Sequence, residues 1–116
     1  MHNYKELSVW NKSVSLATDI YASTKTFPGI EKFGITSQIR RSTVSISSNI
    51  AEGAGRFGKK EFRHFLNIAY GSSFELETQL IISKNLDYLS ELQFNQLTED
   101  LITIQKMLYK LIKSLN

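Results

Sequence analysis

The stretch EGAGRFGKKE, residues 52–61, contains two patterns that are typical of phosphate-binding loops. Gly53, Gly55 and Gly58 fit the G-x-G-x-x-G pattern of dinucleotide-binding folds, and residues 53–59 fit the first seven positions of a Walker A loop, G-x-x-x-x-G-K. Either motif would predict a nucleotide-binding enzyme. Both need a buried strand that leads into the loop and a helix N-terminus that holds the phosphates. The elements on either side of the loop therefore decide its function.

A second candidate is the basic dipeptide formed by Arg40 and Arg41, which is suited to phosphate. In an antiparallel hairpin centred near residue 56, however, the dipeptide falls level with Glu75 and Glu77. Interhelical ion pairs with these carboxylates are the interpretation we prefer.

A third candidate is a polar cluster around His64 and Asn49, which fall at similar heights on the two arms of the same hairpin, with Glu52 and Glu61 nearby. A histidine beside carboxylates can act as a general base, but no nucleophile or second acid has a position beside it. The sequence has no cysteine and one other histidine, His2, which excludes thiolate and histidine-rich metal sites. We therefore expect no catalysis, no metal and no other cofactor.

The elements that position these residues are helices. One proline and six glycines in 116 residues, mostly between periodic segments, are typical of a helix-rich chain. Apolar residues recur at steps of three and four over residues 7–24, 35–52, 59–86 and 90–115. No alternating strand pattern occurs. Residues 1–116 are thus expected to form one all-α domain, an antiparallel up-down-up-down four-helix bundle.

Each periodic segment has a face that is expected to be buried. The positions on these faces are, in chain order, Leu7, Trp10, Val14, Ala17, Tyr21 and Thr24; Ile39, Ile46 and Ile50; Phe62, Phe65, Leu66, Ala69, Ser73, Leu76 and Leu80; and Leu97, Leu101, Ile104, Leu108, Leu111 and Leu115. Small polar residues at 42–48 predict a close approach of a neighbouring helix, and Ser90 with Gln93 predicts a capping box. Phe74, Ile81 and Ile82 widen the third face beyond what one core needs, which predicts an oligomer.

In this organisation the glycine loop joins two helices, so the strand that both nucleotide motifs require is missing. Lys60 also stands where a Walker A loop has its magnesium-binding serine or threonine. Gly53 or Gly55 is instead expected to end the second helix in the left-handed conformation, and Gly58 to ease entry into the third. We expect no hydrolysis of ATP or GTP and no tight nucleotide binding through this loop.

Several stretches closely resemble the bacterial 23S rRNA intervening sequence protein family over nearly the whole chain. They are YKELSVWNKS, FGITSQIRRSTVSISSNIAEGAGR, EFRHFLNIAYGS and ELETQL, of which SQIRR…SNIAEG is the most specific. The resemblance implies an up-down bundle that assembles as a homopentamer and has no established catalytic activity. The family is also similar in fold to the basic, nucleic-acid-binding accessory protein of diversity-generating retroelements, an analogy that does not transfer function.

Charge is unevenly distributed along the expected bundle, whose net charge is +3. We call the end that carries both chain termini and residues 53–60 the basic end: nine cations and three carboxylates give it +6, whereas five cations and eight carboxylates give the other end −3. Helix dipoles account for cations near helix C-termini, but Lys59, Lys60 and Arg63 begin a helix, where cations are disfavoured. Solubility is one explanation for them, and a polyanion is another.

Two hypotheses for the function remain. The first is an oligomer that binds RNA or DNA weakly through the basic end, with Arg56, Lys59, Lys60, Arg63, Lys110 and Lys113 as the candidate contacts. The second is an assembly or adaptor protein whose partner is another protein. No apolar stretch has membrane-spanning length and no signal peptide is evident, so a cytoplasmic protein that does not enter membranes is expected.

Overall fold

The structure, a computed structural model, describes residues 2–116. Its long helices are α1 (Ser8–Thr24), α2 (Ile35–Ala54), α3 (Lys59–Asn85) and α4 (Glu91–Ser114), and the short 3-10 helices η1 (Tyr4–Glu6) and η2 (Gly29–Glu31) precede α1 and α2. Over the described residues the chain has four α-helices and no β-strand. The expected all-α fold with four helices is confirmed.

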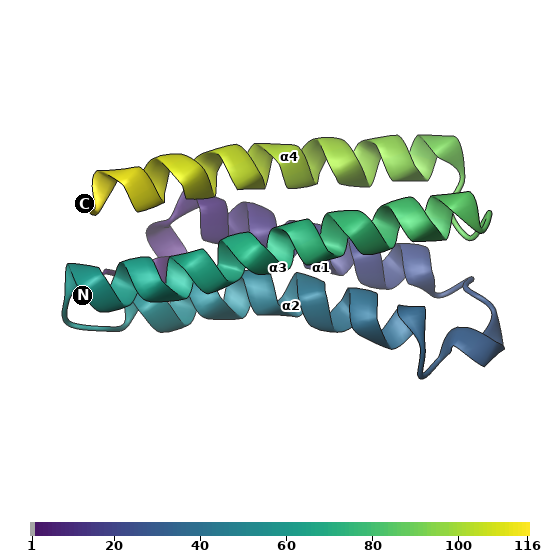
Figure 1. Cartoon of the computed structure of the whole chain (residues 1–116), viewed down its shortest axis with the longest axis horizontal. Helices are drawn as coiled ribbons and strands as arrows, with labels where there is room; N and C mark the ends of the chain where they lie inside the picture. Colours follow the sequence, from purple (N-terminus) through teal and green to yellow (C-terminus); the bar gives the residue numbers. More distant parts are fainter. Residues whose placement is uncertain (1) are drawn as a thin grey trace.

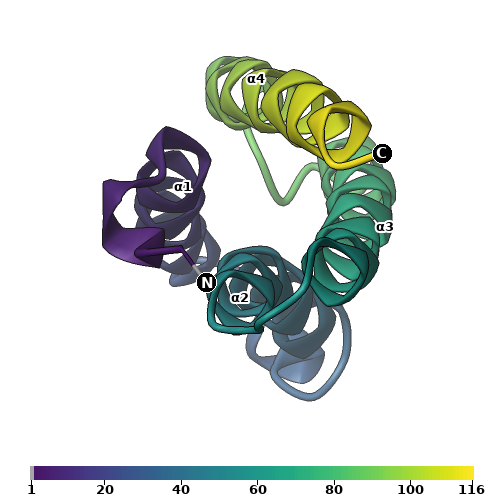
Figure 2. The same ribbon diagram turned by 90° about the vertical axis from the view of Figure 1, so that its left-hand side faces the viewer.

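The four helices lie side by side along the long axis of a molecule that measures 43 × 24 × 20 Å (Figure 1). Seen from one end, α1, α2, α3 and α4 follow one another around a common core (Figure 2). The most extensive packing is between α2 and α3. Both chain termini lie at the same end as the loop between these two helices (Figure 1), and the His2 N–H donates to the Ala54 carbonyl at 2.8 Å. Within residues 2–116, no helix combines the length and apolarity needed to cross a lipid bilayer.

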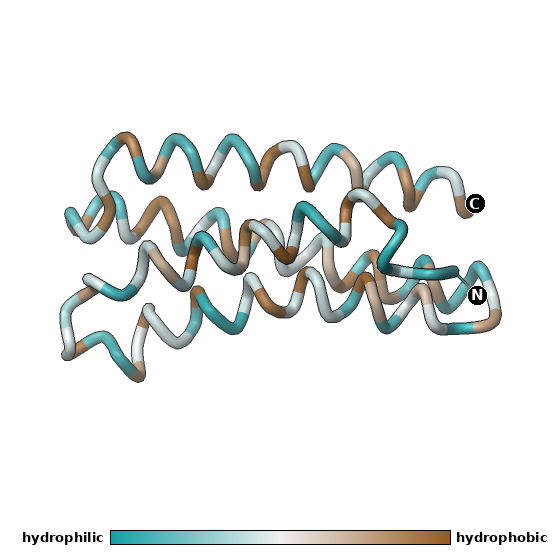
Figure 3. The backbone as a smooth tube through the Cα atoms, turned by 180° about the vertical axis from the view of Figure 1, so that it is seen from behind, coloured by the Kyte–Doolittle hydropathy of each residue, from teal (hydrophilic) through white to brown (hydrophobic). Residues whose placement is uncertain are grey.

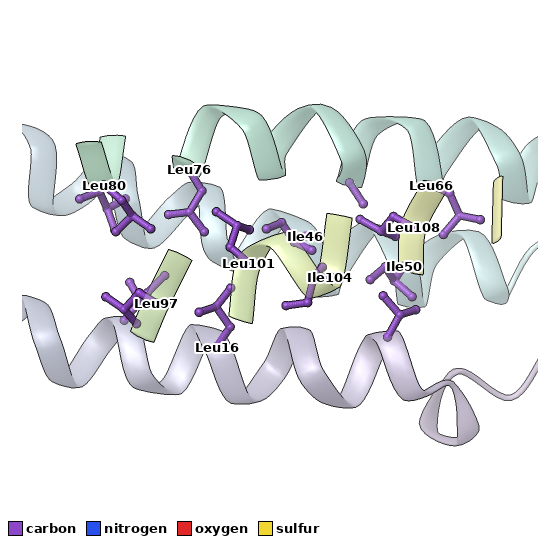
Figure 4. Close-up of a cluster of buried hydrophobic side chains, with 14 of the residues drawn as sticks. Leu16, Ile46, Ile50, Leu66, Leu76, Leu80, Leu97, Leu101, Ile104 and Leu108 are labelled. Carbon is purple, nitrogen blue, oxygen red and sulfur yellow. The ribbon is translucent and has the colours of Figure 1, made fainter. Parts of the chain in front are cut away.

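The core is a layer of aliphatic side chains that all four helices supply. Apolar residues recur along each helix in Figure 3, and Figure 4 shows Ile46, Leu66, Leu76 and Leu108 directed into the same interior space. The predicted core positions of α2, α3 and α4 are confirmed as buried, apart from Phe65 and Leu111, which are partly buried. Phe74, Ile81 and Ile82 are 46%, 44% and 42% exposed, so apolar surface does remain outside this core.

The predicted buried face of α1 was wrong apart from Thr24, which is buried as expected. Its buried positions are Val9, Ser13, Leu16, Ile20 and Thr24, whereas Val14 and Tyr21 of the predicted stripe are exposed and Trp10 is partly buried against the edge of the core. Both faces carry apolar residues at helical spacing. The buried face includes Ser13 because its hydroxyl donates to the Val9 carbonyl of the preceding turn at 2.7 Å, which satisfies the group without an outside partner.

The two predicted helix boundaries had opposite outcomes. The capping box of α4 is confirmed, since the Gln93 N–H donates to Ser90 Oγ at 3.1 Å and the Ser90 N–H donates to Gln93 Oε1 at 3.0 Å. The left-handed glycine at the end of α2 was wrong: Gly55 has a φ of −80°, and no glycine has a positive φ within the described part of the chain. The chain turns into the loop without needing that conformation.

Gly53 has a different role, because it lies inside α2 where this helix touches α3. A Cβ atom at this position would lie 2.8 Å from Phe65 Cβ and 3.1 Å from the Phe62 carbonyl oxygen, distances at which something must move. Gly53 therefore allows the two helices to approach closely at the basic end. The buried Ser42 and Thr43, together with the hydrogen bond between Ser45 and Ser72 (2.9 Å), continue this thin interface along α2.

Gly53→Ala should therefore lower the free energy of unfolding by about 1–3 kcal/mol, the usual cost of overpacking a close contact. Gly55→Ala is the matched control, because its Cβ would find no atom nearer than 3.6 Å and its backbone is already helical. That substitution should be neutral or stabilising by up to about 1 kcal/mol. Urea unfolding of both variants at one protein concentration measures the difference, and equal midpoints would show that Gly53 is not a packing position.

Candidate nucleic-acid interface

The loop between α2 and α3 forms the centre of the basic end. It consists of residues 55–58, and its path is set by the close contact at Gly53 on one side and by Gly58, whose extended backbone begins α3, on the other. Phe57 at its tip is 87% exposed. A helix precedes this loop, so the strand–loop–helix arrangement of either phosphate-loop motif is not present.

Lys59 and Lys60 are exposed cations at the centre of the basic end. They form the first turn of α3, where Glu61 is the one acidic residue, and both side chains are exposed. The ion pairs found among residues 2–116 involve neither of them. Because the N-terminus of a helix carries partial positive charge, each lysine here costs a few tenths of a kcal/mol up to about 1 kcal/mol, and no carboxylate contact offsets that cost.

Arg56 is partly committed to contacts within the chain. Its Nη2 atom lies 3.7 Å from Glu52 Oε1, one helical turn earlier, and its guanidinium carbon lies 4.9 Å from the centroid of the Phe65 ring. A surface ion pair of this kind contributes little to stability, and the contact with Phe65 places the guanidinium beside an aromatic ring.

Arg63 has a structural role that the sequence did not predict. Its Nη1 atom donates to the Leu115 carbonyl at 2.9 Å and to Asn116 Oδ1 at 3.4 Å. The carbonyls at the end of a helix lack partners within the helix, so Arg63 neutralises the C-terminus of α4 from the neighbouring helix. This contact within the chain is an explanation for Arg63 in addition to the solubility and the polyanion that the sequence suggested, and the charge of Arg63 still adds to the basic end.

The two candidate lysines of α4 lie apart from the loop. Lys110 lines a surface groove between α3 and α4 together with Tyr70 and Tyr109, and Lys113 Nζ lies 5.6 Å from the centroid of the Tyr109 ring. Since Arg63 of α3 is level with Leu115, these lysines are further from the loop than Lys59 and Lys60 are. They form a side of the basic end, and Lys59, Lys60 and Arg56 form its tip.

A hollow of about 520 Å³ beside the loop adds residues that the charge pattern did not reveal. Arg56, Lys60, Glu61, His64 and Phe65 line it. His64 packs edge-on against Phe65, with ring centroids 5.4 Å apart. Cations beside aromatic rings on one concave surface are suited to a single strand of nucleic acid, whose bases stack on such rings. The sequence could have placed His64 beside Lys60, because residues four positions apart share a helix face. It could not have added Phe65 to the hollow, because that contact depends on how the helices pack.

The other two candidate clusters of the sequence do not form as expected. Arg40 reaches α1, where its Nε atom donates to Thr24 Oγ1 at 2.9 Å, so the predicted ion pairs with Glu75 and Glu77 were wrong. Glu75 accepts instead from the Ser42 hydroxyl at 2.7 Å, and Glu77 accepts from Gln105 Nε2 at 3.0 Å.

The predicted polar cluster around His64 also fails to form. The Asn49 amide donates within its own helix, to the Ser45 carbonyl at 2.8 Å, while His64 lines the hollow described above. No group of three or more potential metal ligands occurs together in the described part of the chain.

Comparisons with protein families and with solved structures both find relatives of this chain. The family model for the 23S rRNA-intervening sequence protein matches residues 5–110. The chain is also similar to a crystal structure of a protein with unknown function from the S23 ribosomal protein family of Bacteroides thetaiotaomicron, with 30% sequence identity and a TM-score of 0.84. The similarity covers 90% of this chain and 98% of that one. No curated protein matches the chain.

Proposed function

The chain belongs to the 23S rRNA-intervening sequence protein family, and from this premise we propose that it is a non-enzymatic, up-down-up-down helical bundle that forms a homopentamer and binds RNA or DNA weakly through its basic end. The observation that carries the binding proposal is the exposed, unpaired state of Lys59 and Lys60 at the start of α3. The lack of cysteine suits the reducing cytoplasm, where we expect the protein to act.

The position of Lys59 and Lys60 favours a polyanion as the ligand, because it has an electrostatic cost that no contact within the described chain offsets. Lys59 and Lys60 lie where the dipole of α3 disfavours cations, and Arg56, a residue of the loop itself, adds a third positive charge. Phosphates near this tip would meet all three cations and the exposed backbone N–H groups of the first turn of α3. Such contacts depend little on sequence, because phosphates carry no base information.

Self-association is supported by apolar surface on two opposite sides of the bundle. On one side, Phe74, Ile102 and Tyr109 line the groove between α3 and α4, and Ile81 lies two helical turns beyond Phe74. These four residues are 38% to 51% exposed, and we call them, with Tyr70, the α3–α4 strip. On the other side, Trp10, Val14 and Ala17 of α1 and Val44 of α2 form the α1–α2 strip, in which Val14 and Val44 are 36% and 40% exposed.

The placement of the two strips favours a ring. In Figure 2 the α1–α2 pair and the α3–α4 pair occupy opposite sides of the bundle. A head-to-tail interface joins two different patches of neighbouring subunits and closes into a ring when the rotation allows it. We propose five subunits because the resemblance to this family implies a homopentamer. In such a ring the basic tips repeat around one rim, so weak contacts add through multivalency.

A protein partner is the alternative function. The observation that favours it is Phe57, a large apolar ring that is 87% exposed at the tip of a basic loop, since an acidic peptide with an apolar anchor would suit the same surface. In that case binding to RNA and DNA would be absent at all salt concentrations.

Fluorescence anisotropy with labelled single-stranded RNA and with duplex DNA separates the two functions. We expect binding that weakens steeply between about 50 and 200 mM salt, with a slope of log K against log salt of about −0.7 per neutralised phosphate for the single strand. Unrelated sequences of equal length should bind with similar affinity. A protein that retains neither nucleic acid at the lower salt concentration would favour the adaptor function.

A further inference from the structure

A hollow of about 400 Å³ lies on the outer surface at the start of α2, at the opposite end of the bundle from the basic loop. We call it the α2 pocket. Lys32, Arg40 and Arg41 line it, and no carboxylate does. Three cations thus gather around one concavity at the end whose overall charge is negative.

The cations of the α2 pocket are not neutralised within the described chain. Lys32 and Arg41 take part in none of the ion pairs found among residues 2–116. The nearest carboxylate in sequence, Glu31, is occupied, because its Oε2 atom accepts from the Tyr88 hydroxyl at 2.9 Å and its Oε1 atom faces the Ile35 N–H at 3.4 Å. The hydrogen bond between the Tyr88 hydroxyl and Glu31 also raises the pKa of Tyr88.

Two aromatic rings border the cations. Phe33 is 88% exposed, with Lys32 Nζ 5.4 Å from its ring centroid. Tyr21 is 42% exposed, and the Arg40 guanidinium carbon lies 4.6 Å from its centroid. Arg40 is held there by hydrogen bonds to Thr24 Oγ1 and to the Tyr21 carbonyl, so one cation of the pocket has a fixed position. Exposed rings next to fixed cations are suited to stacking a planar ligand.

Thr36, one of the residues that line the pocket, carries a polar group that lacks a partner. It is 8% exposed, and its Oγ1 atom is buried without a hydrogen bond. Thr36 lies in the first turn of α2, and the residue before that helix, Gly34, provides no side-chain cap. The Thr36 Oγ1 atom is too buried to reach a ligand, and the Ile35 N–H already faces Glu31. The three cations are therefore the groups of this pocket that suit an oxyanion.

We propose that the α2 pocket binds a nucleotide unit, with its phosphate on Lys32, Arg40 and Arg41 and its base stacked on Phe33 or Tyr21. An inorganic anion or an acidic peptide would use the cations but leave the rings exposed, whereas a nucleotide uses both. The unit comes either from a free mononucleotide or from a single strand. This site is independent of the basic end and of the function proposed for it.

Calorimetric titration of the full chain with AMP, adenosine and inorganic phosphate tests the pocket. We expect AMP to bind more tightly than either fragment. Phe33→Ala should weaken AMP binding at least about fivefold, the lower end of the range for removing a stacking ring, and Arg41→Gln should weaken it comparably. Both side chains are accessible at the pocket, so the variants should melt as the parent does. Lys25→Gln and Leu92→Ala are the controls, since each removes an exposed cation or an exposed apolar side chain outside the pocket.

A hexaadenylate titration in the Lys59→Gln/Lys60→Gln background identifies the source without interference from the basic end. Tighter binding than AMP that is abolished by Arg41→Gln supports a single strand as the ligand, and affinity equal to that of AMP supports a free nucleotide. The proposal is overturned if the parent does not bind AMP, if Phe33→Ala and Arg41→Gln bind it as the parent does, or if phosphate alone binds as tightly as AMP.

Discussion

Replacing Lys59, Lys60 and Arg63 together by glutamine is expected to weaken binding of single-stranded RNA roughly tenfold or more at about 50 mM salt. The loss should be similar for unrelated sequences, because the contacts are to phosphates. Since Arg63 already donates to the Leu115 carbonyl at 2.9 Å, the double variant Lys59→Gln/Lys60→Gln should account for most of this loss. Anisotropy measured as a function of salt should show a shallower slope, by about 0.7 for each phosphate that is no longer neutralised.

Two controls separate charge from position in this experiment. Lys25→Gln/Lys84→Gln removes the same charge as the double variant but from the opposite end of the bundle, and it should change binding little. Arg63→Gln alone should instead reduce the free energy of unfolding by about 1 kcal/mol, the typical contribution of one hydrogen bond. If the triple variant binds RNA as well as the parent, nucleic acid does not use the basic end.

Phe74→Glu is expected to convert the oligomer into monomers, because it places a charge in the middle of the α3–α4 strip. Light scattering at micromolar concentration should give a parent mass near five chains of 13.3 kDa, or about 67 kDa, and a variant mass near that of one chain. Val14→Glu in the α1–α2 strip should have the same effect. Leu92→Glu is the control, since Leu92 is 69% exposed outside both strips and its replacement should leave the mass unchanged.

A mixture of the two interface variants tests the head-to-tail arrangement itself. The Phe74→Glu chain keeps an intact α1–α2 strip, and the Val14→Glu chain keeps an intact α3–α4 strip, so one of each can still pair. The mixture should therefore show dimers, although each variant alone is monomeric. A strip that pairs with its own copy would instead leave one of the two variants fully assembled. A parent that is monomeric at this concentration would contradict self-association altogether.

Three of the four buried helix faces could be predicted from the sequence because one strong stripe dominates each of them. α1 carries two overlapping stripes, and periodicity alone favours the one with Trp10 and Tyr21. The buried stripe is instead the one with Leu16 and Ile20, which also includes Ser13. A serine that donates to its own helix can be buried at little cost, and a hydropathy pattern scores it as polar.

The candidate site was predictable in its location but not in its contacts. Short connections between long helices place the termini and the 55–58 loop at one end, so the charge imbalance followed from the sequence. Arg63 donates to the C-terminus of α4, and Arg40 donates to Thr24 and Tyr21. These hydrogen bonds depend on how the helices are rotated and on how far the long side chains reach. The close approach at Gly53 was hidden for the same reason, since a glycine near a helix end has several uses.

Photocrosslinking of the parent protein to single-stranded RNA that contains 4-thiouridine, followed by peptide mapping, tests the proposed function most directly. If the basic end binds nucleic acid, crosslinks should concentrate within residues 55–65, where Phe57, His64 and Phe65 offer rings beside the phosphate contacts, and they should disappear in the Lys59→Gln/Lys60→Gln variant. An absence of crosslinks within residues 55–65, or crosslinks at these residues that persist unchanged in that variant, would contradict binding through the basic end.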